Sequence, residues 1–321
     1  MHMSKPAVIG IDGGGTHTRV LVCDLAGRQL AYVDSPRAAS IYKDSNAAQN
    51  VRHSIAEALA AAAIRPEEVR CVAAGIAGYD KPEDLGWVAE LTALPGLHCP
   101  KLHMNDAVAA HAGALEAKPG IVAISGTGSI ILGITGSHEH IRNYDFHHYA
   151  HSAARFLAYD AVYEVLAGHA AASDRALVES MLNHWNAADL RALAAIGRQG
   201  FQADNKERDK HFGQFAPFVT EAAQRGSTIA VDVCDRAIHQ LKTGIEMIGA
   251  SFESETVEVA YIGSVIRSGY VSSRLSEQLA QGSNKRYLAV EPALSPVAGA
   301  VLLAYQKLGA AAPEASLLVI Q

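Results

Sequence analysis

The sequence predicts an α/β protein built from two duplicated lobes with a cleft between them. A glycine-rich hairpin occurs twice, first over residues 8–22 and again over 121–132. In each copy a buried apolar strand, a turn of small residues and a second apolar strand follow one another. After each copy, segments with strand and helix patterns alternate, which is typical of layered α/β folds. Lys118-Pro119-Gly120 separates the two series, because the pattern restarts directly after it.

We therefore expect a first lobe over residues 1–118 and a second lobe over 119–305. The C-terminal helix, placed at about 306–321, is expected to cross back and complete the first lobe. At 321 residues, the chain is long enough to bury a core in each lobe.

The first lobe is predicted to hold three strands followed by alternating helices and strands. Apolar runs at about 6–11, 17–24 and 29–34 give the three strands. Proline suits the first turn of a helix, so one of the later helices begins near Pro82. The elements after the third strand are expected at 46–63 (helix), 69–74 (strand), from Pro82 (helix), 101–104 (strand) and 107–116 (helix).

The second lobe is predicted to begin with its own three strands and to continue into a helical block at about 152–250. Within this block, helices at 208–225 and 228–250 have a clear 3.6-residue periodicity. The remaining elements are expected at 257–262 (strand), 271–280 (helix), 287–290 (strand) and 296–308 (helix).

Composition and charge narrow the functional class. Apolar residues make up 49% of the chain and charged residues 19%, which is typical of a globular protein. The net charge of −6 disfavours nucleic acid as a partner, and no apolar run is long enough to span a membrane. The N-terminus lacks a signal-peptide pattern, and the four cysteines are scattered without a C-x-x-C pair. We expect a cytoplasmic protein whose partners are small molecules rather than nucleic acid or a membrane.

The two glycine-rich turns are the strongest functional signal. Their glycines align with one another, and each turn ends with a hydroxyl residue. Glycines let the backbone approach an anion closely, and the hydroxyls add hydrogen-bond donors. We predict that the two turns face each other and hold the two ends of a polyphosphate. The predicted phosphate-binding residues are Gly13, Gly14, Gly15, Thr16, Thr18, Gly126, Thr127, Gly128 and Ser129.

Two commoner phosphate motifs do not fit these turns. A dinucleotide-binding turn needs G-x-G-x-x-G between a strand and a helix. Here Thr18 breaks that spacing and the turn opens into a strand. No Gly-Lys-Ser/Thr follows, which excludes a Walker A loop. A pair of ordinary hairpin turns is the remaining alternative.

Asp12 ends a buried strand beside the first turn. A carboxylate there would repel a phosphate unless a cation lay between them. We therefore predict that Asp12 binds Mg²⁺, directly or through water. The alternative is an aspartate that only stabilises the turn.

Taken together, the motifs resemble the acetate and sugar kinase/heat-shock chaperone/actin superfamily. Within it, nearly the whole chain is similar to the BadF/BadG/BcrA/BcrD-type ATPases and the N-acetylglucosamine kinases. The segments that carry the resemblance are D-G-G-G-T-H-T at 12–18, N-D-A at 105–107, S-G-T-G-S at 125–129, Y-I-G-S-V at 261–265 and P-V-A-G-A at 296–300.

The resemblance implies two ribonuclease H-like (actin-like ATPase) lobes and an ATP-dependent kinase. Such an enzyme transfers the γ-phosphate of ATP, with Mg²⁺, to a hydroxyl of a small polar acceptor, here an amino sugar or related carbohydrate. Asp106 matches the family's general base, although an aspartate at a helix start is also a common N-cap. Gly263 and Ser264 match the adenosine-binding Gly-Gly turn, for which a plain turn is the alternative.

The acceptor side departs from the family. N-acetylglucosamine kinases usually have a G-G-W/R-G…G-D-E-G-S stretch after the second hairpin, and residues 143–155 here lack its Trp, glycines and acidic pair. We therefore expect a changed acceptor preference, away from N-acetylglucosamine. Three histidines at 147, 148 and 151 suggest either a metal site on one helix face or, as we favour, a polar lining. The expected acceptor contacts are Ala77, Gly78, Asn105, Asp106, Thr127, Asp145 and His148.

Two other functions compete with the kinase. A non-catalytic ATP-binding switch or sensor of the same fold would have little need for Asp106. An ATPase that activates a radical dehydratase would need closely placed cysteines for an iron–sulfur cluster, and the cysteines here are scattered. We also expect the protein to form a homodimer.

Overall fold

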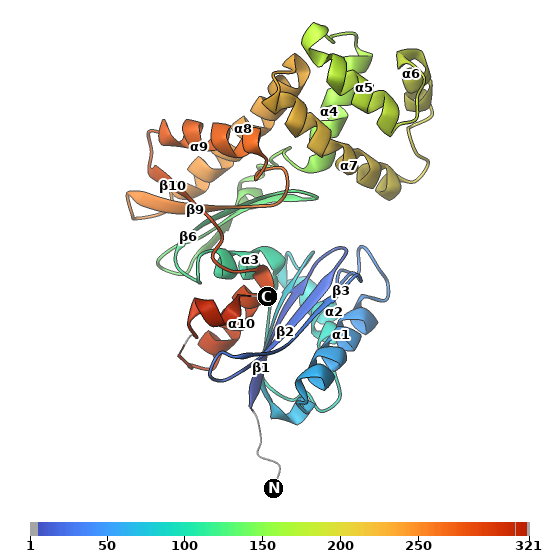
Figure 1. Cartoon of the computed structure of the whole chain (residues 1–321). Helices are drawn as coiled ribbons and strands as arrows, with labels where there is room; N and C mark the ends of the chain where they lie inside the picture. The colour runs from blue at the N-terminus through green and yellow to red at the C-terminus, as the bar shows by residue number, and fades with distance from the viewer. Residues whose placement is uncertain (1–5, 312, 320–321) are drawn as a thin grey trace. The chain divides into compact units, whose positions relative to one another are not determined.

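The two hairpins form the centres of two five-stranded sheets (Figure 1). The computed structural model describes residues 6–311 and 313–319. The chain divides into a first unit, up to Pro119 and again from Glu291, and a second unit, Gly120–Val290. The strand orders are β3-β2-β1-β4-β5 and β8-β7-β6-β9-β10, so one topology occurs twice. This confirms the predicted duplicated α/β fold.

The first unit follows the predicted order of elements. Antiparallel pairing joins β1 to β2 and β2 to β3, whereas β1, β4 and β5 run parallel. The elements are β1 (Ala7–Gly13), β2 (Thr18–Asp24), β3 (Gln29–Ser35), α1 (Ala47–Ala62), β4 (Val69–Ile76), α2 (Leu85–Leu91), β5 (Lys101–Asn105), α3 (Asp106–Ala114) and α10 (Pro296–Lys307).

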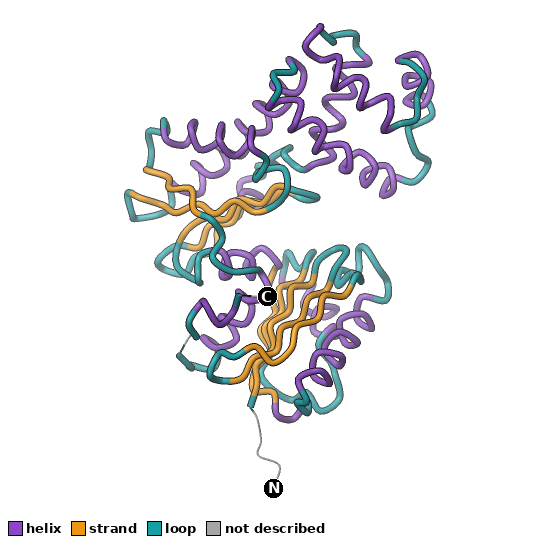
Figure 2. The backbone as a smooth tube through the Cα atoms, in the orientation of Figure 1, coloured by secondary structure: helices purple, strands orange, loops and turns teal. Residues whose placement is uncertain are grey.

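Helices cover both faces of the first sheet, as Figure 2 shows. Side chains alternate across a strand, so neighbours in β1 enter different cores. Ile9 packs in one core with residues of α1, including Ile55. Val8 packs in the other core with residues of α10, including Val301. The sheet is therefore a buried layer between two helical layers, which explains why β1 is apolar at nearly every position.

The C-terminal boundary differs from the prediction. We expected residues 119–305 in the second lobe and a helix at about 306–321, but the segment from Glu291 onward belongs to the first unit. The helix that crosses back is α10, whose Tyr305 is buried against β2 with its hydroxyl bonded to the carbonyl of Asp24. Among the described residues beyond α10 there is only a short 3₁₀ turn, Ala315–Leu318.

The second unit repeats the scheme and adds helices. Between β8 and β9, where the first unit has the single helix α1, it has five helices, α4 to α8, grouped beside the sheet (Figure 1). Their apolar faces and one face of the sheet share a single core. The elements are β6 (Gly120–Ser125), β7 (Ser129–Ile134), β8 (His140–Arg142), α4 (Ala154–Leu166), α5 (Arg175–His184), α6 (Leu190–Arg198), α7 (Asn205–Gln224), α8 (Thr228–Gly249), β9 (Thr256–Ile262), α9 (Gly269–Ala280) and β10 (Arg286–Val290).

The contact between α3 and α10 depends on the absence of a side chain at Gly299. A Cβ there would lie 2.2 Å from the backbone oxygen of Ala109 and 2.2 Å from the nitrogen of Gly113. Because both are backbone atoms, they cannot move aside cheaply. We predict that Gly299→Ala lowers the free energy of unfolding by about 1–3 kcal/mol, the usual cost of overpacking.

The matched control is Gly86→Ala in α2, where an added Cβ meets nothing within 4 Å. That substitution should leave stability unchanged or raise it, because alanine is the better helix former. Urea denaturation of both variants measures the difference. Equal stability of the two variants would contradict the close α3–α10 packing.

Candidate active site

The ends of three parallel strands bring the predicted residues of the first unit together. Gly13 of β1, Ile76 of β4 and Asn105 of β5 lie in one row across the sheet. Asp12 therefore lies near the start of α3, where Asp106 is the first residue. The backbone N–H of Ala77 donates to the carbonyl of Gly13 at 2.8 Å, which joins the predicted acceptor loop to the first glycine-rich turn.

The N-cap of α3 is Asn105, so the alternative role for Asp106 as the cap is wrong. The side-chain oxygen of Asn105 accepts the N–H of Ala107 at 2.9 Å. Its amide nitrogen donates to the carboxylate of Asp80 at 2.9 Å and to the carbonyl of Tyr79 at 3.2 Å. Asn105 thus fixes the start of α3 to the 75–80 loop. Asp80 was not among the predicted site residues, although it lies in the same loop as the expected acceptor contacts Ala77 and Gly78.

Asp106 has the properties of a base that works near neutral pH. Burial raises the pKa of its carboxyl group to about 6, and the negative charge of Asp12 acts in the same direction. A general base is most effective when its pKa lies near the working pH.

Asp12 is buried and paired with Arg19. The Arg19 guanidinium lies 3.2 Å from the Asp12 carboxylate, and it also lies 3.1 Å from that of Asp34. Burial raises the pKa of Asp12, and the attraction of Arg19 offsets only part of this effect. Arg19 was missed from the sequence, but the hairpin register that pairs position 12 with position 19 is a usable signal.

The residues present fit a magnesium ion. Mg²⁺ in phosphoryl-transfer sites is usually held by one or two carboxylates, several waters and substrate phosphates, not by a cage of protein ligands. Asp12 is such a carboxylate, and burial raises its pKa because Arg19 compensates its charge only in part. Within residues 6–311 and 313–319 there is no group of three or more candidate metal-ligating side chains, which this mode of binding does not need.

The first glycine-rich turn is held by its own backbone. The N–H of Gly14 donates to the carbonyl of His17 at 2.8 Å, and the carbonyl of Gly14 accepts from Ala39 at 3.0 Å. Thr16 is exposed at the turn. Thr18 is placed differently from the prediction, because its hydroxyl is buried and donates to the carbonyl of Arg37 at 2.8 Å. That hydroxyl holds the chain after β3 and is not presented at the surface.

The second glycine-rich turn and the predicted adenosine turn lie side by side in the second unit. Ile124 pairs with Ile262, so the residues that follow these two strands are neighbours. The N–H of Val265 donates to the carbonyl of Ser125 at 3.1 Å. Gly263 has a φ of +106°, and a Cβ there would lie 2.4 Å from that same carbonyl oxygen. Glycine is therefore required at the first position of the turn, whereas Ser264 is sterically acceptable at the second.

The start of α4 also contacts this turn, which sequence reasoning missed. The hydroxyl of Ser125 donates to the carbonyl of Ser152 at 2.6 Å, and the hydroxyls of Ser129 and Ser152 lie 2.7 Å apart. The N–H of Ala154 donates to the carbonyl of Gly126 at 2.7 Å. The expected phosphate loop, the expected adenosine turn and the first turn of α4 therefore form one hydrogen-bonded group.

Two predicted acceptor residues of the second unit are held by other partners within that unit. The carboxylate of Asp145 pairs with the guanidinium of Arg142 at 2.9 Å. Burial raises the pKa of Asp145, but the hydrogen bonds and charge of Arg142 outweigh it and the net pKa is lowered. His148 instead packs against α8, where a Cβ at Gly244 would lie 3.1 Å from its ring. Burial lowers the pKa of His148.

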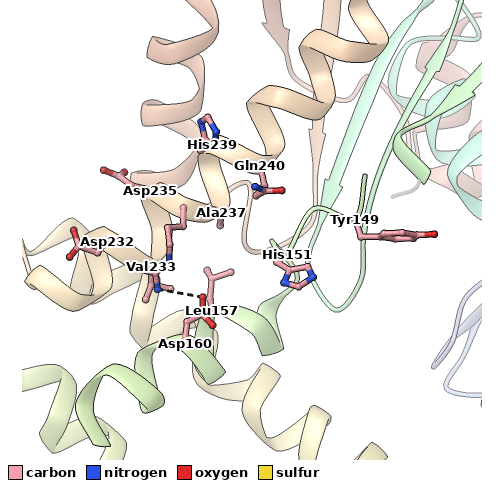
Figure 3. A pocket seen from close by; sticks show the side chains of 11 residues that line it. Tyr149, His151, Leu157, Asp160, Asp232, Val233, Asp235, Ala237, His239 and Gln240 are labelled. Atoms are coloured by element: carbon pink, nitrogen blue, oxygen red, sulfur yellow. Dashed lines mark hydrogen bonds and ion pairs between the residues drawn. The ribbon is translucent and has the colours of Figure 1, made fainter. Parts of the chain in front are cut away.

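Other side chains of the 143–155 segment line a cavity of about 740 Å³ between α4 and α8. Figure 3 shows His151 at this cavity, with Asp160 of α4 and Gln240 of α8. The expected shared helix face of 147 and 151 is wrong, because His147 has a φ of 54° and no helix runs from it to His151. The three histidines belong to no metal-ligating group among the described residues.

No helix in the described part of the chain is long and apolar enough to cross a membrane. Cys23, Cys71 and Cys234 are buried, and burial raises the pKa of each thiol. Thiols in such surroundings are unreactive and act as small apolar side chains.

Comparison with known proteins confirms the resemblance. Residues 9–145 match the BadF/BadG/BcrA/BcrD ATPase family model. The chain is 26% identical over 332 aligned residues to the N-acetyl-D-glucosamine kinase of Dictyostelium discoideum, covering 94% of this chain and 98% of that protein. It is 33% identical over 127 residues to the N-acetylmuramic acid/N-acetylglucosamine kinase of Clostridium acetobutylicum, covering 39% of this chain and 42% of that protein.

Solved structures show the same fold. A candidate N-acetylglucosamine kinase from Chromobacterium violaceum superposes with a TM-score of 0.71 at 21% identity, covering 94% of this chain and 99% of that chain. A ROK family glucokinase from Streptomyces griseus, in complex with glucose and AMPPNP, gives a TM-score of 0.57 at 19% identity with the same coverage. The two units are thus the duplicated lobes of an actin-like ATPase fold.

The raised pKa of Asp106 predicts a pH-dependent cost in stability. The folded protein holds the Asp106 proton up to about pH 6, whereas in the unfolded chain this group ionises near 3.8. Its contribution to stability therefore falls as the pH rises from about 4 to 6 and is constant above that. Asp106→Asn removes this cost, so the variant should become more stable than the parent protein above pH 6, by up to about 3 kcal/mol.

Urea denaturation of both proteins between pH 4 and 8 measures this difference. A stability difference that does not change across this range would show that the pKa of Asp106 is not raised.

Proposed function

We propose that this relative of the N-acetylglucosamine kinases is an ATP-dependent kinase that phosphorylates a hydroxyl of an amino sugar or related carbohydrate. Asp106 carries the proposal: it is a carboxylate with a pKa raised to about 6, next to a glycine-rich turn and a second carboxylate, Asp12. The names of the relatives from Dictyostelium discoideum and Clostridium acetobutylicum support the substrate class.

In this proposal Asp106 accepts the proton of the acceptor hydroxyl as its oxygen attacks the γ-phosphorus of ATP. The bond between the γ-phosphorus and the β,γ-bridging oxygen breaks, and ADP leaves. Asn105 holds the start of α3 against Asp80, which fixes the position of the base. Asp12 would hold Mg²⁺, which would supply positive charge to compensate the phosphates. Arg19 keeps part of the Asp12 charge compensated when no ion is bound.

The remaining predicted residues take binding roles. The Gly13–Thr16 turn of the first unit and the Gly126–Ser129 turn of the second bind phosphates through backbone N–H and hydroxyl groups. Gly263 and Ser264 contact the adenosine. Ala77, Gly78 and Asn105 contact the acceptor on the side of the base. We also propose that the protein is a homodimer and lies in the cytoplasm.

We further propose that the acceptor site differs from that of the N-acetylglucosamine kinases. Residues 143–155 lack the family's acidic pair, and the structure holds Asp145 in a pair with Arg142. We therefore expect N-acetylglucosamine not to be the best acceptor. An ADP-release assay over N-acetylglucosamine, glucosamine, other hexoses and aminocyclitols ranks acceptors by kcat/KM.

Asp106→Asn tests the base. The variant should retain its affinity for ATP, because Asp106 does not belong to the glycine-rich turns, but its turnover should fall by about 10²- to 10⁴-fold. Single-turnover measurements on the best acceptor of the screen give the rate, and calorimetry gives the affinity.

Turnover close to that of the parent protein would remove Asp106 from the mechanism. Nucleotide binding without phosphate transfer to any acceptor, in the parent protein, would favour the switch or sensor.

Gly128→Val tests the second turn. A Cβ at Gly128 meets nothing within 4 Å, so the larger side chain fits the fold but occupies the space above the turn. We expect an unchanged melting temperature and at least a tenfold loss of ATP affinity, because a phosphate can no longer approach the backbone.

Gly136→Val is the matched control for this variant. It also places the side chain in open space, but in the turn between β7 and β8. The control should bind ATP normally. Normal ATP affinity of Gly128→Val would refute the assignment of the turn.

A further inference from the structure

Arg155, in the first turn of α4, connects the second glycine-rich turn to the helices between β8 and β9. One nitrogen of its guanidinium donates to the carbonyl of Thr127 at 3.4 Å. On another side, its Nε lies 3.5 Å from the carboxylate of Asp209 in α7. A single side chain thus reaches from the exposed tip of the turn to a helix that lies about 50 residues further along the chain.

Packing fixes the direction of the Arg155 side chain. Its guanidinium carbon lies 4.4 Å from the centroid of the Phe156 ring, a cation–π contact. His151, which lines the α4–α8 cavity, stacks on the same ring with centroids 4.7 Å apart. Only about a third of the Arg155 side chain is exposed. An arginine on a free surface would have many rotamers available, whereas these contacts leave few.

Asp209 is held in turn by its neighbours in the helices. It accepts a hydrogen bond from the hydroxyl of Tyr159 at 2.9 Å, and that hydroxyl accepts from the Nε of Arg208 at 3.0 Å. The far end of the Arg155 contact is therefore a fixed carboxylate rather than a mobile surface charge.

We propose that Arg155 is a positioning residue for the nucleotide, which holds the Thr127 carbonyl so that the N–H groups of the Gly126–Ser129 turn face the phosphates. This inference rests on the proposed function. It adds that the helices between β8 and β9 contribute to nucleotide binding through Arg155 of α4 and Asp209 of α7. The carbonyl of Gly126 is already bound to the N–H of Ala154, so Arg155 fixes the next carbonyl of the same turn.

The test is nucleotide affinity, measured by calorimetry with MgADP and MgATP. Arg155→Ala should weaken both by about tenfold, because a charge-assisted hydrogen bond that orders the turn is lost. Arg155→Lys should recover part of the affinity. Arg175→Ala is the matched control: it removes one positive charge from α5, where Arg175 pairs with Glu179, and it should bind normally.

Asp209→Asn distinguishes positioning from simple charge. If Arg155 acted on the phosphates by its charge alone, neutralising its acidic partner would strengthen nucleotide binding. If it positions the turn, losing that partner should weaken binding by about two- to fivefold. A gain in affinity in Asp209→Asn would therefore overturn the proposal.

Two readouts separate positioning from a general effect on folding. The melting temperature of Arg155→Ala should stay within a few degrees of the parent protein, and KM for ATP should rise while KM for the acceptor is unchanged. Normal nucleotide affinity in Arg155→Ala would overturn the inference alone. If the parent protein binds no nucleotide, both the inference and the proposed function are overturned. If it binds nucleotide but phosphorylates no acceptor, only the proposed function is overturned.

Discussion

The burial of two carboxylates at one edge of the sheet is the constraint on which the first unit depends. Asp12 lies at the end of β1 and Asp106 follows β5, with β4 between these two parallel strands, and burial raises the pKa of both. Ionised groups in such surroundings cost free energy unless opposite charge or hydrogen bonds compensate them. Arg19 pairs with Asp12, whereas burial raises the pKa of Asp106 by more than backbone N–H groups lower it. This uneven compensation leaves one carboxylate suited to bind a cation and the other suited to take up a proton.

The second unit has the same topology but different polar groups at its strand ends. At the ends of β6 and β9 its polar groups are backbone and serine hydroxyls. Gly263 allows the neighbouring chain to approach Ser125 closely, which brings two loops and the start of α4 into contact. The end of β1 thus carries a carboxylate, whereas the matching end of β6 carries serine hydroxyls and backbone donors.

Much of this could be predicted from the sequence. Periodicity and the repeated turns predicted the order of elements along the chain and the duplication, because each sheet begins with local hairpins. The positions of Asp12, Asn105 and Asp106 followed from their places at strand ends. The contacts of Arg155 and Ser152 could not be predicted, because they join segments brought together only by packing. The expected acceptor roles of Asp145 and His148 rested on their place in the 143–155 segment after the second hairpin. In the structure, a local pair with Arg142 and packing against Gly244 decide their environments.

The discontinuous first unit has a consequence for synthesis on the ribosome. Val8 and Leu21 lie on the face of the sheet that α10 covers, and α10 is made almost 300 residues later. Until then, that apolar face has no helix from the C-terminal segment to bury it, whereas the face covered by α1 is complete early. During synthesis from the N-terminus, the chain would therefore expose this apolar surface until the second unit has been made. Nascent-chain chaperones would have a defined target on this protein, the α10 side of β1 and β2, until α10 has been made.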